Sequence, residues 1–122
     1  MNELIDKAQE ELDRVEELLE AEFCDDGLVF YHLTNAVLFL LKALSSEYNL
    51  NIDSESISEI VETIEKRTTV KFPHWIDEIL ELEEISVSDG CGASICYDMD
   101  MYGDVLDAVY QLKEFVLSQV ER

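Results

Sequence analysis

The sequence predicts an all-α protein, an antiparallel bundle of four to five helices that forms one domain over residues 1–122. Apolar residues recur three and four positions apart in several segments, which is the spacing of one helix face. Nearly half of the residues are apolar and a single proline interrupts the chain, so few breaks are expected. The stretch from Leu28 to Leu44 carries one permanent charge, Lys42, and predicts a central helix covered by neighbours on most sides.

Two helices are predicted in the first half of the chain. Asn2 is suited to cap a first helix that runs to about Phe23, and residues 25–27 (Asp-Asp-Gly) break the chain after it. The central helix follows and runs to about Tyr48, ahead of the polar loop 49–53. The apolar face of the first helix is formed by Leu4, Ile5, Ala8, Leu12, Val15, Leu19 and Phe23.

The central helix is not predicted to cross a membrane. At about 17 residues it is at the lower limit for a bilayer span, and it contains polar residues. Among these, His32 is expected to be hydrogen-bonded in the core or at an interface. Glu3 and Asp6 occupy the place of the basic segment that begins a signal peptide. Three cysteines, an odd number, do not suggest a disulfide framework, so a cytoplasmic protein is expected.

A third and a fourth helix are predicted next. Ser56 and Glu59 have the spacing of a capping box and open the third helix, which ends at Arg67. Lys66 and Arg67 suit its C-terminus, where the helix dipole favours cations. The fourth helix is predicted over about 73–85, with the proline in its first turn.

Residues 86–103 hold three of the four glycines and are predicted to be irregular, before a final helix over about 104–119. Cys91 and Cys96 form one loosely spaced pair, whereas zinc sites usually show two tight pairs of ligands. The end of the segment begins like a calcium-binding loop, but Val109 stands where that loop needs a bidentate glutamate. No metal and no cofactor is therefore predicted.

The formal net charge is −21, from 29 acidic and 8 basic residues. A surface this acidic repels the phosphates of nucleic acids and anionic lipids, so direct binding to either is disfavoured. A basic protein partner, or a positively charged groove into which the molecule fits, is favoured instead. A surface that serves only solubility would carry the same charge.

Two segments resemble a known family. Residues 31–36 (Tyr-His-Leu-Thr-Asn-Ala), followed by residues 41–44 (Leu-Lys-Ala-Leu), look like the second helix of HEPN domains. Residues 96–98 (Cys-Tyr-Asp), ahead of residues 107–108 (Asp-Ala), are similar to the family's connector into its last helix, where Arg-Tyr-Pro-Asp is common. The resemblance implies a HEPN-like bundle and a homodimer.

By the same resemblance, many family members are ribonucleases, often toxins, and others are inactive partners of nucleotidyltransferases. Active members carry an arginine and a histidine with four to six residues between them, where the third helix gives way to the fourth; Arg67 and His74, with six residues between them, fit that spacing. The resemblance implies His74 as the base and Arg67 as the group that holds the scissile phosphate. Thr68, Pro73 and Ile76 depart from the family's pattern, and short spaced motifs often occur by chance.

The predicted function is therefore a non-catalytic, acidic protein–protein interaction module of HEPN-like fold. By resemblance its partner is a nucleotidyltransferase or another component of a toxin–antitoxin or defence system. Two alternatives stay open: a metal-independent ribonuclease that uses Arg67 and His74, and an acidic nucleic-acid mimic that inhibits a basic DNA- or RNA-binding protein. The candidate partner-binding residues lie on the acidic faces of the first and fourth helices: Glu10, Asp13, Glu17, Glu20, Asp77, Glu78, Glu81, Glu83 and Glu84.

Overall fold

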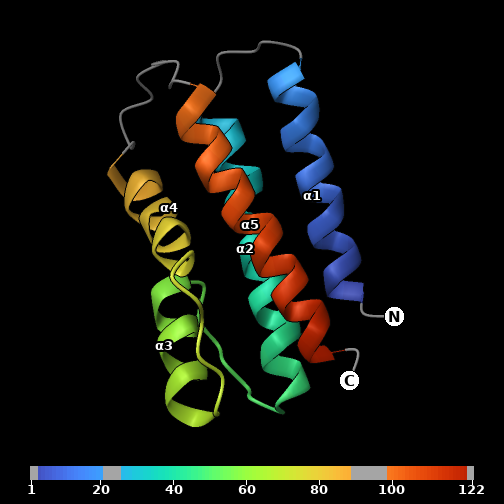
Figure 1. The fold of residues 1–122 in the computed structure, drawn as a ribbon, viewed down its shortest axis with the longest axis vertical. Coiled ribbons are helices and arrows are strands. Elements are labelled where there is room, and N and C mark those ends of the chain that lie inside the picture. Colours follow the sequence, from blue (N-terminus) through green and yellow to red (C-terminus); the bar gives the residue numbers. More distant parts are fainter. Residues whose placement is uncertain (1–2, 21–25, 89–98, 121–122) are drawn as a thin grey trace.

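The computed structural model describes residues 3–20, 26–88 and 99–120, and the side chains of 26–27, 83–88 and 99–102 lie outside that description. These ranges contain five helices and no strand, which confirms the predicted all-α bundle (Figure 1). The helices are α1 (Glu3–Glu20), α2 (Asp26–Glu47), α3 (Ile57–Arg67), α4 (Ile76–Ser88) and α5 (Met99–Val120).

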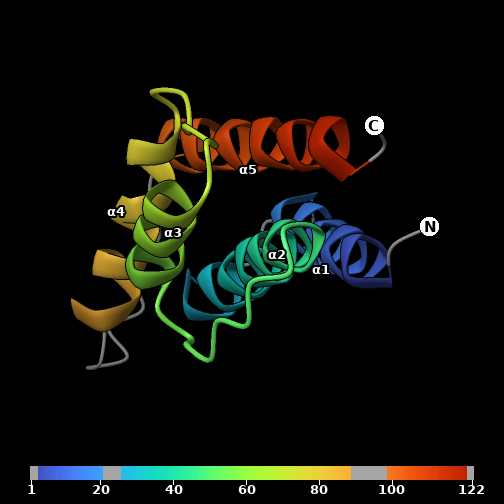
Figure 2. The ribbon, with the colours of Figure 1, turned by 90° about the horizontal axis from the view of Figure 1, so that it is seen from below.

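Helix α2 is the centre of the bundle, because it contacts all four other helices. Its most extensive contact is with α1, which runs antiparallel to it, and α5 packs on it next (Figure 1). Helices α3 and α4 follow one another along a single side of the molecule (Figures 1 and 2). The predicted central helix is therefore confirmed, with neighbours on most of its sides.

One hydrophobic core joins all five helices. Leu33, Leu40 and Leu44 of α2 are fully buried in it, against Leu12 of α1 and Leu112 of α5. Each fully buried leucine contributes about 1.5–3 kcal/mol relative to an exposed one, so α2 is the main hydrophobic contributor to stability. By length and composition α2 could also cross a membrane, but a little over half of it is buried inside the bundle, as in the core helix of a soluble protein.

The start of α3 follows the sequence prediction, with one change in the cap. The Ser56 side chain accepts a hydrogen bond from the Glu59 backbone N–H at 3.4 Å, as a capping box requires. The Glu59 carboxylate, however, accepts from the Ser54 hydroxyl at 2.6 Å, and that hydroxyl in turn accepts from the Ser56 N–H at 3.1 Å. Ser54 therefore relays the second half of the cap.

Two predicted helix starts are wrong. Helix α4 begins at Ile76, because Pro73 and His74 form a turn in which their carbonyl oxygens accept from residues three positions later. Helix α5 begins at Met99, so Gly103 lies inside a helix and not in an irregular segment. A glycine within a helix costs about 1 kcal/mol relative to alanine, and the long apolar face of α5 outweighs that cost.

Candidate functional site

The two candidate catalytic residues, Arg67 and His74, are both exposed. Arg67 is the last residue of α3, and His74 lies in the turn before α4. No hydrogen bond or ion pair within the described ranges holds either side chain. The structure therefore brings both residues to the predicted junction but does not fix them in a catalytic geometry within one chain.

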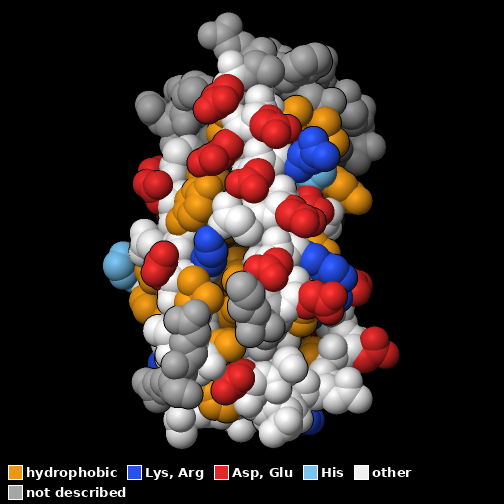
Figure 3. All heavy atoms as spheres, turned by 90° about the vertical axis from the view of Figure 1, so that its right-hand side faces the viewer, with side chains coloured by type: hydrophobic (Ala, Val, Ile, Leu, Met, Phe, Trp, Pro, Cys, Tyr) orange, Lys and Arg blue, Asp and Glu red, His pale blue; other side chains and the backbone are white. Residues whose placement is uncertain are grey.

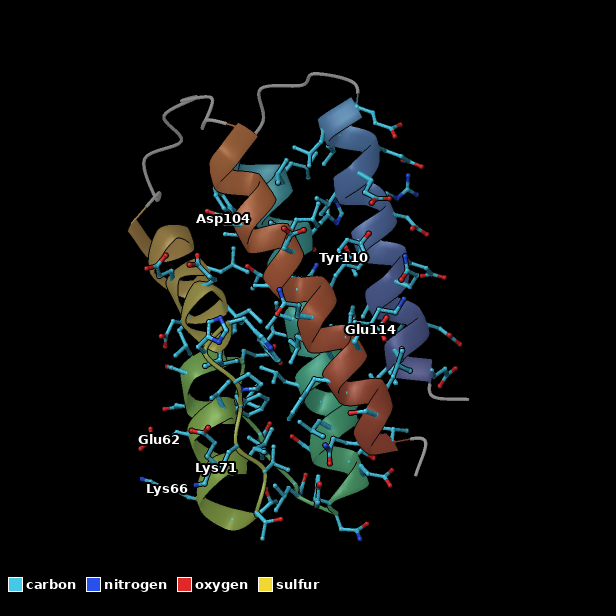
Figure 4. The ribbon with its side chains drawn as sticks, viewed as in Figure 1. Glu62, Lys66, Lys71, Asp104, Tyr110 and Glu114 are labelled. Atoms are coloured by element: carbon cyan, nitrogen blue, oxygen red, sulfur yellow. The ribbon has the colours of Figure 1, made fainter. Side chains whose placement is uncertain are left out.

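Arg67 borders an open depression of about 440 Å³ at the end of α3, and His74 does not. Lys66 also borders it and pairs with Glu62 over 2.8 Å, on the outer side of α3 (Figure 4). The hydrogen bond from Lys66, together with its charge, lowers the pKa of the exposed Glu62 carboxyl. The remaining lining residues are Asn51, Ile52, Asp53, Ser54, Glu59 and Thr63.

The carboxylates predicted on α1 are all exposed: Glu10, Asp13, Glu17 and Glu20. Gln9 donates to Asp13 at 2.9 Å, and Arg14 pairs loosely with Glu17 at 3.4 Å. Figure 3 shows acidic side chains over the face that contains α1, with few cations between them. This part of the predicted surface is accessible to a partner.

The carboxylates predicted as a binding surface on α4 differ in their exposure. Asp77 and Glu81 are exposed, and Glu78 is half-buried. The side chains of Glu83 and Glu84 lie outside the described residues. Among the described residues of α4, the accessible acidic surface is therefore formed by Asp77 and Glu81.

A second open depression, of about 520 Å³, was not predicted from the sequence. It lies along α5 beside the turn before α4, and we call it the α5 depression. Tyr110 and Glu114 lie on α5, with Asp104 nearer the start of the helix (Figure 4). The spacing of the acidic residues along α5 could have indicated the acidic side of this depression. Its aromatic side could not be predicted, because it combines residues from distant segments. Its lining residues are Trp75, Asp107, Tyr110, Gln111, Glu114 and Phe115.

The aromatic part of the α5 depression belongs to a packed cluster. The rings of Trp75 and Phe115 meet edge to face with centroids 5.7 Å apart, and Phe72 lies 5.4 Å from Phe115 and 6.4 Å from Trp75. Such pairs contribute about 0.5–1.5 kcal/mol beyond their buried area, so the rings are firmly held. The cluster joins the turn before α4 to α5.

His32 forms a hydrogen-bonded pair with Glu11 between α2 and α1, through its Nδ1 and one carboxylate oxygen. Its predicted hydrogen bonding is confirmed. Tyr31, the neighbouring residue, is 60% exposed, and its ring meets the His32 ring edge to face at 5.2 Å. No group of three or more possible metal ligands occurs among the described residues. Cys24, Cys91 and Cys96 lie outside them.

The outer side of α2 is a partly apolar surface that carries little charge of its own. No Asp or Glu occurs from Leu28 to Ser46, and Tyr31, Leu38 and Phe39 lie on this side, exposed or half-buried. Lys7 of α1 lies over the Phe39 ring, 6.0 Å from its centroid. We call this surface the outer face of α2.

The arrangement is a helical bundle built on one apolar central helix, with acidic outer helices. A family model described as HEPN domain matches residues 1–119. The chain therefore belongs to the HEPN family. No curated protein and no solved structure matches it.

Proposed function

We propose that this HEPN-family chain is a non-catalytic protein–protein interaction module that binds a basic protein in the cytoplasm. A nucleotidyltransferase, or another component of a toxin–antitoxin or defence system, is the partner class that the family suggests. Direct binding of nucleic acid or of a membrane is not part of the proposal, because the net charge of −21 repels phosphate groups.

The observation that carries this proposal is the accessible, poorly compensated row of carboxylates on α1. Glu10 and Glu20 are exposed and have no ion pair within the described ranges, and Glu17 has only the loose contact with Arg14. Exposed charges of one sign attract an oppositely charged partner over about 10 Å at physiological salt. They also raise its association rate. Asp77 and Glu81 extend the acidic surface onto α4.

We propose a non-catalytic function because no described residue holds the side chains of Arg67 and His74 in place. Catalytic groups need to be held within a fraction of an ångström of their working positions, usually by hydrogen bonds from neighbouring residues. No described residue holds either side chain. The turn that contains Pro73 also separates His74 from the regular part of α4.

We further propose that the chain forms a homodimer through the outer face of α2. HEPN domains commonly dimerise, and two copies of this chain meet with the least repulsion where carboxylates are few or already paired. The outer face of α2 meets that condition and exposes Tyr31, beside Leu28 at 38% exposure. Lys42 on the same helix is already paired with Glu55 at 3.0 Å, so it brings no uncompensated charge to the interface.

The experiment is an affinity capture of the tagged protein from its own host, at low and at high salt, with the captured proteins identified. Charge reversal of Glu10 and Glu20 to lysine is expected to abolish capture of a basic protein. Reversal of Glu47 and Asp53, which are exposed elsewhere on the molecule, is the matched control and should leave capture unchanged. Equal capture by the α1 variant and the wild type would overturn the proposal.

A nucleic-acid mimic would behave differently in the same assay. Its target would be a DNA- or RNA-binding protein, and DNA would compete with the acidic module for it. A nucleotidyltransferase or toxin partner that is captured equally well in the presence of excess DNA supports the interaction module.

A further inference from the structure

We propose that the α5 depression receives an arginine side chain from an extended segment of a basic protein. The inference rests on the proposed function only in that the natural partner is basic. It adds where on this molecule the partner binds and which residue type of the partner is recognised. Four features of the depression support it: its carboxylates, its aromatic wall, the polar oxygen of Tyr110 and the indole N–H of Trp75.

Two carboxylates supply the negative charge of the depression. Asp107 and Glu114 are two helical turns apart on the same side of α5, both exposed, and Gln111 lies between them. Neither carboxylate has an ion pair within the described residues. A guanidinium presents five N–H donors in a planar fork, so it can donate to both oxygens of one of these carboxylates, while the charge of the other adds to the attraction.

The aromatic wall favours arginine over lysine. Trp75 and Phe115 border the depression and are held in place by their contacts with each other and with Phe72. A guanidinium is planar and weakly hydrated and stacks on aromatic rings, whereas an ammonium group keeps its hydration shell. The methylene stem of the arginine would cover the apolar part of the wall.

Tyr110 adds a hydrogen-bond acceptor of fixed position. Its O–H donates to Glu16 Oε1 at 2.9 Å, so its oxygen keeps its lone pairs for a donor from outside. Burial, the hydrogen bond to Glu16 and the negative charges of Glu16 and Asp13 raise the pKa of Tyr110 to about 12. The phenol is therefore neutral and oriented at physiological pH.

The indole N–H of Trp75 offers a hydrogen-bond donor to the segment that carries the arginine. The residue is only 9% exposed and lines the depression, and no hydrogen bond within the described ranges uses its N–H. The N–H is not among the buried side-chain atoms that lack a partner, so it reaches solvent and is available to an acceptor from outside. A guanidinium offers only donors, so the acceptor would be a backbone carbonyl oxygen of the segment that carries the arginine.

The test uses three acetylated, amidated pentapeptides, with arginine, lysine or citrulline flanked by two glycines on each side. Citrulline has the shape of arginine without its charge. Trp75 is the chain's single tryptophan, so its indole N–H gives one NMR signal that reports this depression alone. The arginine peptide should shift that signal saturably, at a concentration about fivefold lower than the lysine peptide. Equal shifts with citrulline, or no saturable shift, would overturn the proposal.

Matched variants separate this depression from the general negative charge. Asp107→Asn with Glu114→Gln removes two charges at the depression and is expected to weaken the arginine peptide about tenfold. Glu47→Gln with Asp53→Asn removes the same number of charges away from the depression, at two exposed residues, and should leave the affinity within about twofold. An equal loss in both variants would overturn the proposal.

The outcomes of the peptide test and of the host capture distinguish failure of the arginine site from failure of the proposed function. If a basic protein is captured and the Asp107→Asn, Glu114→Gln variant captures it equally, the arginine site is wrong and the interaction module stands. If no protein is captured but the arginine peptide saturates the Trp75 signal, the site stands and the proposed function fails.

Discussion

Tyr110 of α5 and Glu16 of α1 are joined by a hydrogen bond of 2.9 Å between helices that are far apart in the sequence. Lys113 and Gln9 form a second hydrogen bond between the same two helices. Helix α1 packs mainly on α2, so these polar contacts are its main ties to α5. The Tyr110 phenol therefore links the side of the α5 depression to the acidic surface of α1.

Tyr110→Phe is expected to destabilise the protein by about 1 kcal/mol at pH 8, because it removes this partly exposed hydrogen bond to a carboxylate. In the wild type, the pKa of Tyr110 is raised from 10.0 to about 12 in the folded state. The folded state therefore holds the phenol proton more tightly than the unfolded state does. The contribution is complete below about pH 10 and is lost as the pH rises towards 12. Urea unfolding of the wild type and the variant at pH 8 and pH 11.5 measures both effects.

The difference between the two proteins should shrink as the pH rises. Glu16→Gln is the companion variant, since it keeps an acceptor for the phenol but removes the negative charge. It should lose stability less steeply above pH 10 than the wild type. A difference between wild type and Tyr110→Phe that stays constant from pH 8 to 11.5 would contradict the assignment.

Salt is expected to stabilise the fold. At a net charge of −21 the folded chain repels itself, and most of the described carboxylates of α1 and α4 have no ion pair with a described residue. Raising NaCl from about 10 mM to about 500 mM shortens the screening length from about 30 Å to a few ångströms. The urea midpoint should therefore increase with salt, and a midpoint that falls would show that the few ion pairs outweigh the repulsion.

The helices that sequence predicts best are those whose signals are local. The apolar periodicity of α1 and the cap at Ser56 need only neighbouring residues, and both are present in the structure. The start of α5 was missed because Gly103 is a poor helix former, while the packing that compensates for it involves distant residues. The start of α4 differs from the prediction because a proline such as Pro73 suits a tight turn as well as the first turn of a helix.

The candidate sites also differ in how well the sequence predicts them, because one depends on local residues and the other on distant ones. The exposure of Glu10 and Glu17 follows from their place opposite the apolar face of α1, so the sequence predicts it. The α5 depression requires Trp75 to meet Phe115, a contact between segments far apart in the sequence. Only the folded chain brings these rings beside the acidic residues of α5.

Ser56→Ala is expected to cost about 1 kcal/mol, because it removes the side-chain acceptor that caps the Glu59 N–H. Ser46→Ala is the control, since Ser46 is exposed in the last turn of α2 and its side chain caps no helix N-terminus. Chemical denaturation of the two variants and the wild type at one pH provides the comparison. Equal stability of Ser56→Ala and Ser46→Ala would show that Ser54 alone maintains the cap.

The homodimer predicts a specific effect at Tyr31, which is 60% exposed in the single chain. Tyr31→Glu places a charge in the centre of the outer face of α2 and is expected to yield a monomer of unchanged helical content. Tyr31→Phe keeps the ring and should remain dimeric. Light scattering coupled to size exclusion, over a range of protein concentrations, measures the mass. A wild type that is monomeric at every concentration contradicts the proposed dimer.

The purified protein is expected not to cleave RNA, because neither Arg67 nor His74 is held by a described neighbour and the surrounding surface repels phosphates. The assay compares wild type, Arg67→Ala and His74→Ala on single-stranded RNA with EDTA present, with circular dichroism to confirm that each variant is folded. All three should leave the RNA at its background rate. Cleavage by the wild type that disappears in a folded His74→Ala variant would instead establish the ribonuclease, with His74 as its base and Arg67 on the phosphate.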